Sequence, residues 1–233
     1  MNSMIPVSLA SGGADTGVSV AQRNRVLRNT YWLLALSMVP TVLGAWIGVS
    51  TGIASAMSPG LGLIVFLGGA FAFMFAIEKT KNSAAGVPVL LAFTFFMGLM
   101  LSRLVGQVLG LANGANLVML AFAGTGAIFL GMASLSSLIK RDLSSMGKFL
   151  FIGAVMLLVA GIANVFIQSS ALMITLSVLA IGIFSAFILH DLKRVQDGFE
   201  TNYISATLGV YLSIYNVFQS LLAVLGLTSG RDE

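Results

Sequence analysis

The residues best able to do chemistry stand close together in the last fifth of the chain. His190 is the only histidine, and Asp191 follows it directly. A carboxylate beside an imidazole can exchange a proton or attract a cation, and imidazole is the side chain that ordinarily changes charge near neutral pH. We take both as candidate pore or gate residues: Asp191 as a pore or partner-site acid that faces the interior of a helix bundle, and His190 as a pH sensor.

Two plainer roles compete with this hypothesis. Asp191 can be an interfacial acid near a helix end, either solvated or paired with Lys193, Arg194 or a loop cation, because charges at helix ends cost little. His190 can be an interfacial residue, like the aromatic residues found at membrane surfaces. The two side chains need not share a face, since adjacent helical residues point about 100° apart.

A long apolar segment follows, from residue 203 to 227, and polar groups recur along it. One set, with spacings of four, three and four, lies on one helix face: Gly209, Ser213, Asn216 and Ser220. A second set follows an adjoining face: Tyr203, Thr207, Tyr211 and Tyr215. Because unpaired polar groups are costly in hydrocarbon, both faces should contact protein. We expect a central helix enclosed by the other helices, with Ser213 and Asn216 as further pore candidates.

Arg103 is the one cation well inside an apolar segment. Its side chain can extend to the outer membrane surface, or it can be buried and tethered to Asn164, Ser213 or a backbone carbonyl. Asn164 and Asn216 are expected to form hydrogen bonds between helices. The small residues Gly126, Gly131 and Ser134 are expected to be close-packing surfaces.

The residue inventory argues against an enzyme. The single histidine is not associated with a G-x-S-x-G motif, and no phosphate-binding loop is found. The chain has no cysteine and one histidine, so we expect no metal site and no cofactor. No basic amphipathic surface indicates a nucleic-acid partner.

The composition indicates an integral membrane protein of the all-α class. The 233 residues are 58% hydrophobic and 9% charged, whereas soluble domains carry roughly 25% charged residues. Seven apolar segments approach the roughly 20 residues that cross a bilayer. We place them at 30–50, 60–77, 87–110, 115–138, 149–168, 171–190 and 203–227.

The basic residues predict an orientation. Ten of the twelve Lys and Arg residues fall before the first segment or in the second–third, fourth–fifth and sixth–seventh connections. The positive-inside rule therefore predicts a cytoplasmic N-terminus and a C-terminus on the opposite, periplasmic or extracellular side. Residues 1–22 are expected to be a disordered cytoplasmic tail, and residues 23–230 a single membrane domain.

Three stretches carry a resemblance to a known family: VLRNTYWLLAL at the first segment, ANVFIQ in the fifth and ETNYISATLGVYLSIYNVFQSLLAVLG at the end. They resemble the Bax inhibitor family, in particular its bacterial YccA-like branch. The resemblance implies seven helices, with two three-helix sets around the last helix. It also implies a protein of the bacterial cytoplasmic membrane that is a modulator, and possible substrate, of the FtsH-type AAA protease.

The same resemblance implies an alternative function, a pH-sensitive leak channel for calcium or other cations. Such members close their pore with two buried aspartates that share a proton. Asp191 matches the first aspartate, but the second position is Ser213. A serine cannot share a proton as a carboxyl pair does, so this chain departs from the channel pattern there.

Overall fold

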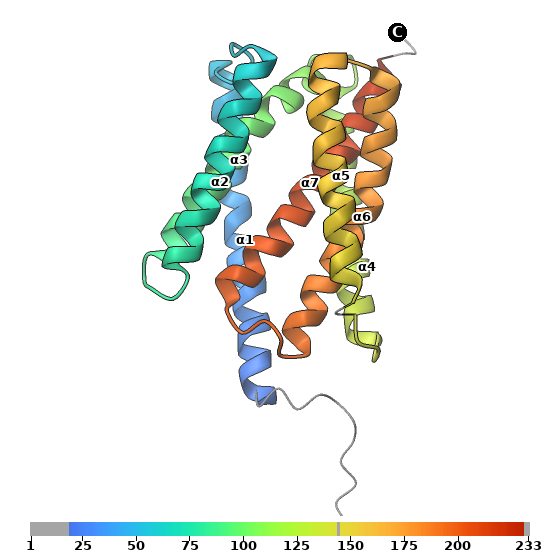
Figure 1. The fold of residues 1–233 in the computed structure, drawn as a ribbon. Coiled ribbons are helices and arrows are strands. Elements are labelled where there is room, and N and C mark those ends of the chain that lie inside the picture. Colours follow the sequence, from blue (N-terminus) through green and yellow to red (C-terminus); the bar gives the residue numbers. More distant parts are fainter. Residues whose placement is uncertain (1–18, 144, 231–233) are drawn as a thin grey trace, which may run out of the picture.

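The computed structural model describes residues 19–143 and 145–230, and every regular element in these ranges is an α-helix (Figure 1). The seven helices are α1 (Val20–Thr51), α2 (Pro59–Thr80), α3 (Gly86–Leu109), α4 (Gly114–Leu138), α5 (Met146–Ile167), α6 (Ser170–Gln196) and α7 (Tyr203–Ser229). Each is long and apolar enough to cross a membrane. The all-α class and the seven predicted spans are therefore confirmed.

Two helices extend well beyond their predicted ends. Helix α1 begins at Val20 rather than near residue 30, because Ser19 accepts a hydrogen bond from the Gln22 amide and caps the helix. The tail boundary expected at residue 22 thus lies inside α1, and residues 1–18 are outside the described ranges. Helix α6 continues to Gln196, so His190 and Asp191 lie within it and not at its end.

The helices form two sets of three with α7 between them (Figure 1). In the first set α3 packs against both α1 and α2, and in the second α6 packs against both α4 and α5. The third helix of each set is therefore its middle member. Both middle helices also pack against α7.

Helix α7 is central, but it is not enclosed on all sides as expected. It packs against α1, α2, α3, α4 and α6, and the described residues include no packing of α5 on α7. Helix α5 is the most apolar span and has no buried residue. With no polar side to bury, α5 remains at the periphery against α6 and the edge of α2.

The closest helix packing joins α1 and α3 through glycines. A Cβ atom built on Gly98 would lie 2.1 Å from the carbonyl oxygen of Thr41, and one on Gly44 would lie 2.2 Å from that of Phe95. Helices in lipid gain stability from such close backbone approach. In contrast, Gly126 and Gly131 of α4 have no neighbouring atom within 4 Å, so the close packing expected there is absent.

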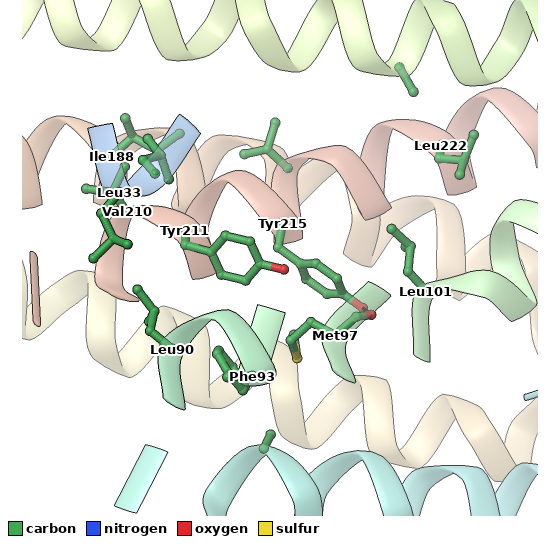
Figure 2. Packing of buried hydrophobic residues seen from close by; sticks show 14 of the residues in the cluster. Leu33, Leu90, Phe93, Met97, Leu101, Ile188, Val210, Tyr211, Tyr215 and Leu222 are labelled. Atoms are coloured by element: carbon green, nitrogen blue, oxygen red, sulfur yellow. Dashed lines mark hydrogen bonds between the residues drawn. The ribbon is translucent and has the colours of Figure 1, made fainter. Parts of the chain in front are cut away.

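The tyrosine face of α7 packs against the first three-helix set. Figure 2 shows Tyr211 and Tyr215 directed toward Phe93 and Met97 of α3. The Tyr211 hydroxyl lies 2.9 Å from the Thr41 hydroxyl on α1, and the Tyr215 hydroxyl donates to the Met97 carbonyl at 3.4 Å. The prediction that this face meets protein is confirmed for both tyrosines.

Candidate functional site

The candidate site lies at one end of the bundle, which we call the basic end. Here α1 begins and the α2–α3, α4–α5 and α6–α7 connections lie (Figure 1). Ten of the twelve Lys and Arg residues belong to this end: Arg23, Arg25, Arg28, Lys79, Lys81, Lys140, Arg141, Lys148, Lys193 and Arg194. Such clustering is typical of a membrane protein's cytoplasmic side.

His190 and Asp191 form a pair in the last two turns of α6. His190 Nδ1 lies 3.1 Å from Asp191 Oδ1, and the histidine residue is 7% exposed. A Cβ atom on Gly147 of α5 would lie 2.7 Å from His190 Nε2. The imidazole is therefore buried and packed against the first turn of α5.

Asp191 approaches α7 instead of α5. Its Oδ2 atom would lie 2.9 Å from a Cβ on Gly209, so glycine at this position leaves space for the carboxylate. The two side chains thus leave α6 in different directions, as helix geometry requires, and meet through their near atoms. Among the described residues, His190 is the only basic side chain within ion-pair distance of Asp191, and Lys193 pairs with Asp197.

Asp191 separates two hollows at the basic end. The larger, about 530 Å³, is lined by Gly147, Lys148, Phe151, Phe187, His190, Asp191, Arg194 and Phe199. The smaller, about 80 Å³, is lined by Asp191, Arg194, Glu200, Ser205, Ala206 and Gly209. Asp191 and Arg194 line both hollows, so the carboxylate stands where they adjoin.

Ser213 and Asn216 lie farther along α7 and line neither hollow. The Ser213 hydroxyl is buried and donates to the Gly209 carbonyl at 3.0 Å. The Asn216 amide donates to the Leu212 carbonyl of its own helix at 2.8 Å. The inter-helix hydrogen bond expected of Asn216 is therefore absent among the described residues.

Arg103 lies near the end of α3 that is remote from the basic end. Its Nη1 atom donates to the carbonyl of Met57, in the α1–α2 connection, at 3.2 Å. Of the alternatives that the sequence left open, the backbone carbonyl is the observed partner. Asn164 instead accepts a hydrogen bond from the Ser169 amide and helps to end α5.

Asn202 is a structural residue at the basic end that the sequence analysis did not single out. Its side-chain oxygen Oδ1 accepts hydrogen bonds from the backbone amides of Ile204 and Ser205, and these bonds cap α7. Its amide nitrogen donates to the Lys81 carbonyl at 3.1 Å and to Asn82 Oδ1 at 2.8 Å. An Asn immediately before an apolar run is a known N-cap signal, but the tether to the α2–α3 connection has no sequence signature.

Comparison with known proteins places this architecture among relatives. The family described as Inhibitor of apoptosis-promoting Bax1 matches residues 23–230. An Escherichia coli K12 protein named Modulator of FtsH protease YccA is 36% identical over 214 residues, covering 92% of this chain and 94% of the relative. Its counterpart in another Escherichia coli strain is named Inner membrane protein YccA.

Two further relatives are similar over almost their whole length. A Vibrio cholerae protein named Uncharacterized membrane protein is 36% identical over 211 residues, covering 91% of this chain and 93% of the relative. A Neisseria meningitidis serogroup A protein named Uncharacterized protein NMA0420 is also 36% identical, over 221 residues, with 94% and 97% coverage. The likeness thus extends over all seven helices.

Proposed function

Because this chain belongs to the Bax inhibitor family, we propose that it is a membrane-embedded modulator of an FtsH-type AAA protease. The observation that carries the proposal is the likeness, over 92% of this chain, to the Escherichia coli protein named Modulator of FtsH protease YccA. The seven apolar helices and the relative named an inner membrane protein support a multi-pass protein of the bacterial inner membrane.

The basic end is the side that we assign to the protease. The excess of Lys and Arg at this end supports a cytoplasmic location for it, and with it for the start of α1. The Asn202 tether joins the α6–α7 connection to the α2–α3 connection, so these two loops form one fixed surface. A partner domain docking there would meet both signs of charge, because Lys81 and Glu200 lie on these connections and Glu78 lies in the adjoining last turn of α2.

Degradation assays test the proposal. The chain is co-reconstituted in liposomes with a purified FtsH-type protease and a membrane-protein substrate, and the substrate's half-life is measured. We expect the chain to lengthen that half-life, while an unrelated multi-pass protein at the same density leaves it unchanged. Equal decay of the substrate with both proteins would refute the modulator role.

A truncated chain tests whether the protein is also a substrate. AAA proteases begin on a segment that they can engage, and we propose that residues 1–18 supply it. The shortened chain starts at Ser19, because this residue caps α1 and should be kept. We expect the shortened protein to melt at the same temperature and to be degraded more slowly. Unchanged turnover would argue against a role for residues 1–18.

A second candidate function, a leak pathway for calcium or other cations, rests on the position of Asp191. The carboxylate stands between two hollows, and no Lys or Arg among the described residues neutralises it. Neutralising it by Asp191→Asn should therefore lower cation flux into liposomes, whereas Glu78→Gln, at an exposed acid of the same end, should not. Equal flux in the wild type and the Asp191→Asn variant would exclude Asp191 as the gate.

The converse variant is Ser213→Asp. It restores the acidic residue that the leak members of the family carry at this position, one turn from Gly209. Two carboxyl groups sharing a proton respond to pH more strongly than one. We expect the variant to make flux more dependent on pH than in the wild type, and an unchanged pH profile would contradict the leak function.

A further inference from the structure

We propose that the larger hollow at the basic end, between α5, α6 and the α6–α7 connection, binds the headgroup of an anionic phospholipid. The hollow measures about 530 Å³, which lies within the usual range for small-molecule sites. It is bounded by the first turn of α5 and by the last turns of α6. The inference concerns a lipid site and does not rest on the protease role.

Two cations in the lining have no ion-pair partner among the residues that the structure describes. Lys148 on α5 and Arg194 on α6 both line the hollow, and neither forms a salt bridge with a described residue. Lys193, the neighbour of Arg194, is by contrast neutralised by Asp197. An Arg and a Lys facing one space match the charge and the oxygens of a phosphate group.

The start of α5 adds to this positive potential. Among the described residues, the Ser145 side chain makes no capping hydrogen bond to α5, and the first turn of the helix has no acidic residue to offset its positive end. Gly147, in that turn, lines the hollow and brings backbone to its surface. The positive end of a helix and two side-chain cations thus act on the same space.

The remaining lining suits an acyl chain. Three phenylalanines border the hollow: Phe151, Phe187 and Phe199. Phe151 is 66% exposed on the outer side of α5, a helix without buried residues. An apolar wall therefore leads from the cationic hollow to the exposed outer surface of α5. The acyl chains of a bilayer lipid can contact this wall, whereas a soluble phosphate has no apolar part to contact it.

Asp191 is the one acid in the lining, and it forms no salt bridge with Lys148 or Arg194. One carboxylate oxygen is held by His190 and the other is packed against Gly209 of α7. Lys148 and Arg194 consequently remain available to a ligand. The net charge that a headgroup meets in this lining is positive.

Native mass spectrometry of the purified full-length chain tests the proposal. The probes are phosphatidylglycerol and phosphatidylcholine of equal chain length, with glycerol phosphate as a soluble competitor. One cation near an anionic membrane surface contributes about fivefold in affinity, so the Lys148→Gln/Arg194→Gln variant should lose roughly 25-fold for phosphatidylglycerol. Its affinity for phosphatidylcholine should not change.

A matched control removes the same charge elsewhere. Lys140→Gln/Arg141→Gln neutralises two cations of the α4–α5 connection that do not line the hollow, and it should keep the wild-type lipid affinity. Lys148→Arg/Arg194→Lys retains both charges and should also bind. Equal losses in the two Gln pairs, or no loss in either, would overturn the proposal.

The competitor separates a lipid site from a phosphate site. We expect glycerol phosphate to displace little phosphatidylglycerol, because it lacks the acyl chains that contact Phe151 and Phe187. Complete displacement at equimolar concentration would overturn the assignment to lipid. Melting temperatures equal to the wild type confirm that each variant is folded, which the exposure of Lys148 and Arg194 leads us to expect.

Discussion

Replacing Gly98 by alanine should destabilise the helix bundle more than the addition of a single methyl group suggests. Gly98 lies where α3 crosses α1, and its new Cβ would lie 2.1 Å from the Thr41 carbonyl oxygen and 3.0 Å from the Ala45 amide nitrogen. Both atoms belong to backbone, so no side-chain rotation can relieve the contact. The two helices must separate.

The required separation sets the magnitude. An ordinary carbon–oxygen contact is about 3.3 Å, so α1 and α3 must move apart by roughly 1 Å. A gap of that size loses up to about half of the dispersion energy of the contacting atoms, and overpacking of this kind typically costs about 1–3 kcal/mol. Alanine's better helix propensity returns at most about 1 kcal/mol. The net loss should be about 1–2 kcal/mol.

Thermal unfolding in detergent, followed by circular dichroism, measures this loss. For a chain of this size the melting temperature should fall by roughly 2–8 °C. The matched control is Gly106→Ala on the same helix, because the nearest atom to its Cβ would be Val49 Cγ2 at 3.9 Å. This control should melt at or slightly above the wild-type temperature.

Two results would refute this reasoning. If Gly98→Ala has the same melting temperature as the wild type, the close backbone approach of α1 and α3 does not limit stability. If Gly106→Ala falls by the same amount, the loss comes from replacing glycine in α3 and not from the contact with α1.

Three smaller effects can be measured by the same melting assay. Asn202→Ala should lower the free energy of unfolding by about 1–2 kcal/mol, because it removes the α7 cap. Asn202→Asp keeps the acceptor oxygen and should lower it by less, so equal losses would contradict the capping role. Tyr211→Phe removes the hydroxyl contact with Thr41 and should cost about 0.6 kcal/mol, the average for such bonds in membranes; a loss of several kcal/mol would indicate a larger network. Arg103→Met should cost about 1 kcal/mol through the lost bond to the Met57 carbonyl while leaving lipid binding at the basic end unchanged; reduced lipid binding would show that the two ends are coupled.

The sequence predicted the helices well because their formation is local. A span in a bilayer must satisfy its backbone hydrogen bonds within itself, so apolar length alone specifies each helix. The two ends that were misplaced, at Val20 and Gln196, are polar extensions of α1 and α6 beyond the apolar runs. The first extension is capped by Ser19, and the second begins at Asp191, where charged residues end the apolar run.

The central position of α7 was also predictable, because polar groups on two faces need protein partners on two sides. Which helices supply those partners could not be predicted from the sequence. The tyrosine face contacts α1 and α3 through Tyr211 and Tyr215, and the glycine face receives Asp191 from α6. Each contact joins residues far apart in the chain, and neither residue's type identifies the other.

By itself, the sequence determined the class of the protein, its seven spans, its polar last helix and the charge difference between its two ends. These properties follow from composition and hydropathy along the chain. Only the tertiary structure decided that His190 is packed on Gly147, that Asp191 rests against Gly209 and that α5 lies outside. The physical reason is that helix formation depends on neighbours in sequence, whereas helix packing depends on matching surfaces of segments that are distant in it.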